Sequence, residues 1–167
     1  FNGNDFDRNV WWNQGENGEW NGQWKGRAPS QFNPDNVAVR DGYLYMTARW
    51  QPDYPFADEY QGGNPTGNLK YGEVAPVTTA ALLGKNYFLY GYMEMRSKAA
   101  PGPISSSYWT TGNQGETDAF ESFGYNPNNK WSAKRFHTSF HDWRTPTRAT
   151  FGKRIWDNAH ILDFNVA

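Results

Sequence analysis

Three carboxylates fall within six residues of the segment Gly115-Glu116-Thr117-Asp118-Ala119-Phe120-Glu121-Ser122-Phe123-Gly124. The residues between the acids are Thr, Ala and Phe, which favour strand or core positions. Successive side chains of a strand alternate between its two faces, so Glu116 and Asp118 share one face. Strict alternation would send Glu121 into the core, where an unpaired carboxylate is costly. One extra residue, a β-bulge, turns Phe120 inward and returns Glu121 to the acidic face. The segment therefore predicts a bulged strand with three acids on one side.

This spacing suits a particular chemistry. With the bulge, Glu116 and Glu121 lie four strand steps apart, about 13 Å between their backbones. Side chains that lean inward can bring the two carboxyls toward the separation of about 5–5.5 Å that a retaining glycosidase uses. Like charges held close push their pKa values apart, so one carboxyl serves as an acid while another stays ionised. The alternative is an edge strand that carries three solvated acids.

The pattern Glu-x-Asp-x-x-Glu on a Trp-rich chain resembles the active-site strand of glycoside hydrolase family 16. The resemblance extends to the segments Phe1-Asn2-Gly3, Tyr90-Gly91-Tyr92-Met93-Glu94-Met95-Arg96 and Ser106-Ser107-Tyr108-Trp109. The first is similar to the end of that family's Asp-Glu-Phe-Asn-Gly opening, the second to its Tyr-Gly-Tyr-x-Glu-x-Arg strand. The third stands where the family has a Trp-bearing strand before the acids. The resemblance implies that Glu116 is the nucleophile, Glu121 the acid/base and Asp118 the residue that orients Glu116.

The composition agrees with a polysaccharide-binding protein. Nine Trp, ten Tyr and eleven Phe in 167 residues exceed what a small core needs, and aromatic rings stack well on sugar faces. Dense Asn and Gly with ten Pro predict many turns between short strands. A net charge of −1 gives no basic footprint for nucleic acid, and no apolar run approaches transmembrane length. The absence of cysteine excludes disulfides and thiolate metal sites.

Several further residues are candidates for substrate binding. Trp24-Lys25-Gly26-Arg27 lies in a Gly- and Asn-rich segment and resembles the part of galactan-degrading family members that crosses the sugar cleft. Trp24 either offers an exposed ring or packs under its own loop, and Arg27 can stack on a sugar or fork to a sulphate. Trp109 is expected beside the cleaved bond, with packing between the sheets as the alternative.

The segment from Arg135 to Trp143 alternates again, which places His137, Ser139, His141 and Trp143 on one face. If this strand lies next to the acidic one, His137 and His141 face the cleft together with Trp143. The two histidines are about 13 Å apart along a strand, so they cannot chelate one zinc ion, and no metal site is expected. A framework role for His137 is equally compatible with the pattern.

Other segments predict the scaffold. Asp41-Gly42 between the runs 36–40 and 43–50 is a strong signal for a type I′ hairpin. Residues 74–83 and 88–98 are each expected to form one strand, and 152–167 one more. We expect an all-β, antiparallel two-sheet β-sandwich (a concanavalin A-like jelly roll) with the acids on a concave face.

The length predicts one domain. The chain starts inside a family motif and ends on Asp163-Phe164-Asn165-Val166-Ala167 without a closing turn. We therefore expect residues 1–167 to be a single glycoside hydrolase catalytic domain, incomplete at both ends and lacking its C-terminal strands.

The resemblance implies a secreted bacterial, monomeric, endo-acting retaining hydrolase of the β-agarase or β-porphyranase branch, acting on a red-algal galactan. It needs no catalytic cofactor, although family members often bind a structural calcium whose ligands the sequence does not identify. Thr111 stands two residues after Trp109, where the porphyranase pattern has Arg. Agarase and porphyranase therefore both remain open, and a laminarinase or lichenase, a transglycosylase and a non-catalytic carbohydrate-binding jelly roll are the alternatives.

Overall fold

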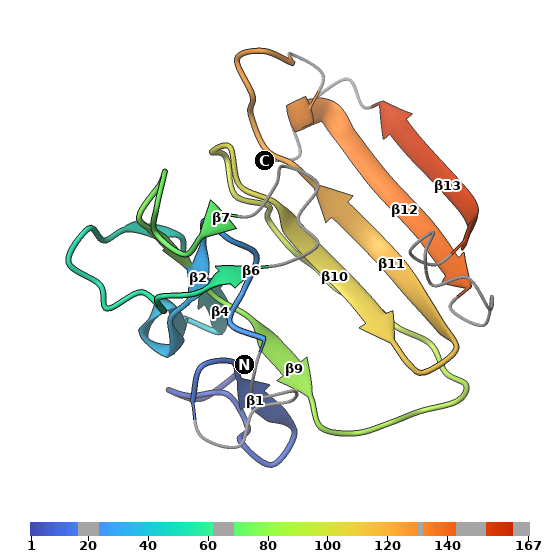
Figure 1. The fold of residues 1–167 in the computed structure, drawn as a ribbon. Coiled ribbons are helices and arrows are strands. Elements are labelled where there is room, and N and C mark those ends of the chain that lie inside the picture. Colours follow the sequence, from blue (N-terminus) through green and yellow to red (C-terminus); the bar gives the residue numbers. More distant parts are fainter. Residues whose placement is uncertain (17–23, 62–68, 130–131, 143–152, 162–167) are drawn as a thin grey trace. The chain divides into compact units, whose positions relative to one another are not determined.

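The computed structural model describes residues 1–16, 24–61, 69–129 and 132–142, and the backbone of 153–161. Strands make up most of the regular structure in these ranges (Figure 1). The same ranges contain two 3-10 helices, η1 (Pro34–Asn36) and η2 (Ser132–Lys134). The prediction of an all-β chain is therefore confirmed. No helix in the described part of the chain has the length and apolarity of a membrane span. The contacts divide the chain into two compact units, Phe1–Tyr92 and Met93–Ala167.

The described residues of the first unit form short strands in four small sheets. Strand β1 pairs with β9, β2 and β5 pair with β8, β3 pairs with β4, and β6 pairs with β7. All of these pairs are antiparallel except β2 with β8, which is parallel. The strands are β1 (Trp11–Asn13), β2 (Gln31–Phe32), β3 (Val37–Arg40), β4 (Tyr43–Met46), β5 (Arg49–Trp50), β6 (Tyr60–Gln61), β7 (Leu69–Lys70), β8 (Val77–Thr79) and β9 (Leu82–Gly84).

The hairpin of β3 and β4 forms as predicted. Val37 pairs with Met46 and Arg40 with Tyr43, which leaves Asp41-Gly42 as a two-residue turn. Both turn residues have positive φ, 53° at Asp41 and 78° at Gly42, as a type I′ turn requires. That turn matches the right-handed twist of the strands it joins.

Polar side chains occupy the interior of the first unit. Asn36 is 1% exposed and donates from Nδ2 to Thr78 Oγ1 at 2.8 Å. The Thr78 hydroxyl in turn donates to Gln51, and Asn33 Nδ2 donates to the same Gln51 oxygen at 3.2 Å. Buried polar groups are tolerated when they are hydrogen-bonded, and this network joins η1, β8 and the residue after β5.

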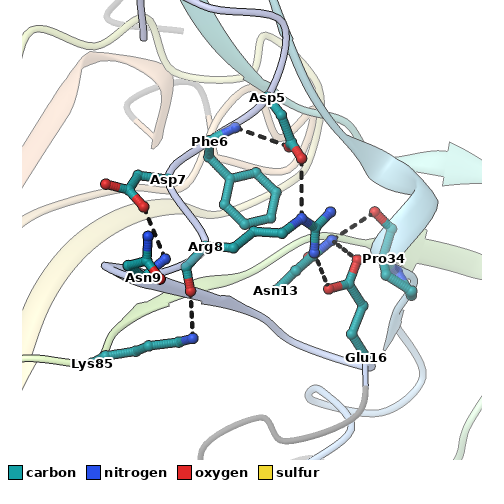
Figure 2. Close-up of polar contacts among 9 residues, drawn as sticks. All are labelled: Asp5, Phe6, Asp7, Arg8, Asn9, Asn13, Glu16, Pro34 and Lys85. Atoms are coloured by element: carbon teal, nitrogen blue, oxygen red, sulfur yellow. Dashed lines mark hydrogen bonds and ion pairs between the residues drawn. The ribbon is translucent and has the colours of Figure 1, made fainter.

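A second polar network fixes the start of the chain (Figure 2). The Arg8 guanidinium bonds the carboxylates of Asp5 and Glu16, with Nε 3.0 Å from Asp5 Oδ2. Asn13 Nδ2 donates to the same Glu16 side chain and, at 3.0 Å, to the carbonyl oxygen of Pro34. Glu16 thus joins Arg8, before β1, to Asn13, and Asn13 in turn bonds the start of η1.

The second unit contains one antiparallel sheet of four long strands (Figure 1). Its spatial order follows the chain order, so each strand lies beside the next: β10 (Ser106–Thr111), β11 (Gly115–Ser122), β12 (Arg135–Asp142) and β13 (Lys153–Ile161). Consecutive antiparallel strands need only short connections, which agrees with the turn-rich sequence between them.

Two strand predictions are wrong in the first unit and at its end. The residues expected to form one strand at 74–83 form β8 and β9, because β8 pairs with β2 and β5 while β9 pairs with β1. Residues 88–98 form no strand, and Tyr90 and Tyr92 are 89% and 86% exposed. Alternation gives this segment a strand-like sequence, but a strand also needs a hydrogen-bonded neighbour, and none pairs with it among the described residues.

We expect Gly124→Ala to destabilise the second unit strongly. Gly124 follows β11 with φ +60°, and a Cβ there would lie 1.8 Å from the Gly102 carbonyl oxygen. The left-handed conformation alone costs about 1–2 kcal/mol for a residue with a Cβ, and the clash adds to it. Urea unfolding should show the loss. Gly112→Ala is the control, because a Cβ at Gly112 meets nothing within 4 Å. Equal unfolding free energies for the two variants would contradict this explanation.

Candidate active site

The pairing of β11 with its two neighbours contains the predicted bulge. On the β10 side, Trp109 lies opposite Asp118 and Tyr108 opposite Phe120, so Ala119 is the extra residue. On the β12 side, the register shifts in the same interval, between Asp118 and Glu121. The side chain of Phe120 is 9% exposed and stacks on Phe136, with ring centroids 5.8 Å apart. The bulge and the inward position of Phe120 are therefore confirmed.

The three acids share one face of the sheet. Directly opposed residues of antiparallel strands point to the same side, and alternate residues of one strand do so too. Glu116, Asp118 and Glu121 lie opposite residues of β12 that are two apart in sequence. These partners are His141, Ser139 and His137, respectively. On the other side, the acids face Thr111, Trp109 and Ser107 of β10. The bulge thus aligns three rows of polar and aromatic side chains on one surface.

Asp118 is the buried centre of this surface. Its side chain is 7% exposed, and its Oδ2 accepts a hydrogen bond from the Ser139 hydroxyl. The same oxygen lies 3.1 Å from His141 Nε2, which is also 3.2 Å from Ser139 Oγ. A buried carboxylate requires such donors. Ser139 and His141 therefore supply the hydrogen-bonding partners that this buried side chain needs.

Glu116 lies at the turn-proximal end of the row and is half-buried. Burial raises the pKa of its carboxyl above the ordinary value of 4.5, and the negative charges of Asp118 and Glu121 raise it further. The charge of His141 and a hydrogen bond from the Thr111 side chain lower the pKa, but they do not cancel the rise. Glu116 is thus a carboxylate of increased basicity beside a fixed negative charge.

Glu116, Asp118 and His141 also offer ligand atoms that all lie within 4.8 Å of one another. Two carboxylates and an imidazole can bind a divalent cation, and they can also hydrogen-bond to one another. Asp118 and His141 already satisfy each other through the 3.1 Å contact. This favours a hydrogen-bonded network, and the sequence-based expectation that no metal takes part stays a prediction.

Three of the predicted binding residues lie on the face of the acids. Trp109 is half-buried opposite Asp118, and His137 is half-buried opposite Glu121. The His137 ring meets Phe123 edge-on, with centroids 5.2 Å apart. His141 also lies on this face, and its Nε2 contacts the carboxylate of Asp118 directly. The roles of these residues in sugar binding stay predictions.

Two of the other predicted binding residues, Trp24 and Arg27, belong to the first unit. The Trp24 ring meets Phe32 edge-on at 4.9 Å, which supports the alternative that it packs under its own loop, whereas Arg27 is exposed. Trp143 lies outside the described residues.

Two residues of the site, Ser139 and Thr111, were not predicted from the sequence. Alternation placed Ser139 on the face of the histidines, but only its pairing opposite Asp118 gives its hydroxyl a carboxylate partner. Thr111 drew attention only as a departure from the porphyranase pattern, yet it faces Glu116 across β10 and bonds it. Both contacts depend on the pairing register between strands, and the sequence of one strand does not specify that register.

We expect Glu116→Gln to raise the free energy of unfolding at neutral pH. The folded pKa lies above 4.5, so wild-type protein loses stability as the pH rises from 4.5 through the folded pKa. The gain should be below about 1 kcal/mol, because a half-exposed carboxylate is screened by solvent.

Urea unfolding at two pH values tests this prediction. The gain of Glu116→Gln should vanish well below pH 4.5, where the wild-type carboxyl is protonated in both states. Asp53→Asn, an exposed carboxyl of the first unit, is the control and should change stability by less than about 0.5 kcal/mol. A lower stability of Glu116→Gln at neutral pH would contradict the origin given for the pKa shift.

Known proteins share this chain's sequence pattern and fold. A family model described as the GH16 domain of β-porphyranases A–D matches residues 1–163. β-Porphyranase D of Zobellia galactanivorans is 28% identical over 159 residues, which are 87% of this chain and 34% of that protein. The chain therefore spans about a third of this curated relative.

Two solved structures show the same fold. Porphyranase B of Zobellia galactanivorans superposes with a TM-score of 0.67 at 20% identity, over 99% of this chain and 60% of that one. The catalytic domain of PdAgaC gives a TM-score of 0.60 at 18% identity, over 94% of this chain and 46% of that one. The predicted fold class, an antiparallel β-sandwich of the jelly-roll type, is confirmed by these neighbours together with the strand content. The chain belongs to glycoside hydrolase family 16, in its agarase and porphyranase branch.

Proposed function

We propose that this chain carries the catalytic centre of a secreted, endo-acting, retaining glycoside hydrolase that cleaves a β-linked red-algal galactan. The observation that carries the proposal is the register of β11, which aligns Glu116, Asp118 and Glu121 on one face through the bulge at Ala119. Membership of family 16 supports hydrolysis of a polysaccharide. Such a substrate is too large to cross a membrane, which supports action outside the cell.

The chemistry is a double displacement. Glu116 attacks the anomeric carbon and forms a glycosyl-enzyme, while Glu121 gives its proton to the leaving oxygen. Glu121 then takes a proton from water, the water attacks the same carbon, and Glu116 leaves. Two inversions restore the original configuration. All bonds that form and break involve these two carboxyls, the sugar and one water molecule.

The electrostatics around Glu116 support its role as nucleophile. A carboxylate whose pKa is raised is more basic once it has ionised, and it therefore attacks more readily at a pH above that pKa. Asp118 lies beside Glu116, where its negative charge raises the pKa of Glu116, and its carboxylate is bonded by Ser139 and His141. The same charge becomes useful when positive charge develops at the anomeric carbon, since it lies on the reacting face.

Porphyran is the first substrate to test. The matching family model and the curated relative both carry the name β-porphyranase. An exposed Arg27 can fork to a sulphate group. Thr111 bonds Glu116 rather than offering a charge to the sugar, which supports agarose as the second substrate. Laminarin and lichenan serve as comparisons.

We expect Glu116→Ala and Glu121→Ala to lose sugar release from porphyran or agarose. The loss in Glu121→Ala should be about 10²–10⁴-fold, as for other general acid/base groups. With an activated aryl glycoside, azide should restore turnover in both variants. In Glu116→Ala, azide displaces the leaving group directly, and this single inversion should give an α-glycosyl azide. In Glu121→Ala, azide attacks the glycosyl-enzyme, and the two inversions should give a β-glycosyl azide. The products are identified by NMR.

Three outcomes contradict the proposal. Sugar binding without release by the wild-type chain would indicate a carbohydrate-binding protein, and the opposite pair of azide products would exchange the two roles. Transfer to an added acceptor sugar in preference to water would make the protein a transglycosylase.

We expect a chain without Ala119 to keep more activity than Glu116→Ala. Removing the extra residue restores strict alternation, so Glu121 stays opposite His137 and Ser107 on the face of the acids. Removing Thr117 is the matched control, because it makes Glu116 and Asp118 neighbours and sends them to opposite faces. Initial rates of reducing-sugar release compare the two. Equal loss in both folded variants would show that the spacing does not determine the activity.

A further inference from the structure

Ser139 and His141 contact the acids but have no part in the bond-breaking steps above. Ser139 is 3% exposed, and its hydroxyl donates to Asp118 Oδ2. His141 Nε2 lies 3.1 Å from that same oxygen and 3.2 Å from Ser139 Oγ. The three side chains form a closed triangle between two neighbouring strands, β11 and β12.

The chemistry of the three groups fixes the direction of these contacts. An ionised carboxylate only accepts hydrogen bonds, so the Ser139 hydroxyl and His141 Nε2–H both donate toward Asp118. The Nε2–H also has the Ser139 oxygen within reach as a second acceptor. Two donors on one oxygen prevent the Asp118 carboxylate from rotating and satisfy a polar group that is only 6% exposed.

We infer that Ser139 and His141 are positioning residues that hold the Asp118 carboxylate in a fixed orientation beside Glu116. This inference rests on the proposed hydrolase function, and it gives His141 a different role from the sugar contact that the sequence indicated. A histidine whose Nε2–H is engaged by Asp118 affects the rate of the chemical step. A histidine that bonds a sugar hydroxyl affects substrate affinity.

The charged groups near Glu116 come from two strands and shift the pKa of its carboxyl in opposite directions. Strand β11 contributes Asp118 and Glu121, β12 contributes His141 and His137, and β10 contributes the uncharged Thr111. Asp118 raises the pKa of Glu116 and His141 lowers it, after the larger effect of burial. His141 therefore counteracts the cost of ionising Glu116 next to Asp118.

A double-mutant cycle on Ser139 and Asp118 is the first test. Ser139→Ala should lower kcat about tenfold with KM within about twofold, because the hydroxyl acts through Asp118. In an Asp118→Asn background, the same substitution should lower kcat by less than about twofold. The inference would be overturned if the kcat losses of the two single variants multiplied in the double variant, or if Ser139→Ala had wild-type kcat.

Thr138→Val is the matched control for Ser139→Ala. Thr138 is the neighbouring hydroxyl on β12, alternation directs it to the opposite face, and its Oγ1 is buried without a hydrogen-bond partner. Its loss removes no contact to Asp118. We expect wild-type kcat and KM, and a loss equal to that of Ser139→Ala would mean that any change in β12 disturbs the site.

His141→Gln separates positioning from sugar binding. Glutamine keeps an N–H donor but cannot carry a positive charge, so the acid limb of the kcat/KM profile should move to higher pH. The sign follows from the lowering of the Glu116 pKa by His141, which the variant loses. KM should stay within about twofold. A large rise in KM with unchanged kcat and pH profile would assign His141 to the substrate instead.

NMR of the imidazole nitrogens tests the arrangement without any turnover. The chain has three histidines, so the His141 signal can be assigned by substitution. In wild-type protein, Nε2 should be the nitrogen that carries the hydrogen in the neutral ring. Its signal should change in Asp118→Asn but not in Thr138→Val. An unprotonated Nε2 at neutral pH would overturn the inference. If the wild-type chain released no sugar, the proposed function would fail, and this signature alone would decide the Asp118 contacts.

Discussion

One extra residue in β11 is the constraint on which the site depends. The strand has to bury Phe120 against Phe136 and still present Glu121 beside the other two acids. Regular alternation cannot satisfy both requirements, because Asp118 and Phe120 would share one face of the strand and Glu121 would lie on the other. The bulge at Ala119 satisfies both. The apolar packing on one face of the sheet thereby fixes the chemistry on the other.

The neighbouring strands convert this local arrangement into a polar surface. Strands β10 and β12 each place every second residue beside an acid, so the site is built from rows rather than from isolated side chains. Asp118 is the most buried acid of the row and carries the Ser139 and His141 contacts. Glu116 is less buried, with Thr111 as its partner on β10. Neighbouring carboxylates in one strand thus have different environments, which is what separates their chemical roles.

The relatives show which features tolerate change in sequence. Porphyranase B has the same fold at 20% identity, so most positions of the chain accept other residues. What a β-sheet requires is a pattern of inward and outward side chains, turns of the correct type and pairing between strands. Asp41-Gly42 and the bulge at Ala119 are examples of such requirements, since each fixes the path of the backbone.

The sequence by itself determined the features that depend on one strand or one turn. Alternation and the cost of a buried carboxylate were enough to predict the bulge and the common face of the acids, and two residues were enough for the type I′ hairpin. Tertiary structure alone decided which strands pair and in which register. It placed Ser139 opposite Asp118, divided 74–83 into two strands, gave 88–98 no strand pairing among the described residues and packed Trp24 on Phe32. The physical reason is that hydrogen bonds between strands and contacts across a sheet join residues far apart in the chain. The local pattern of one strand does not specify which other strand will pair with it.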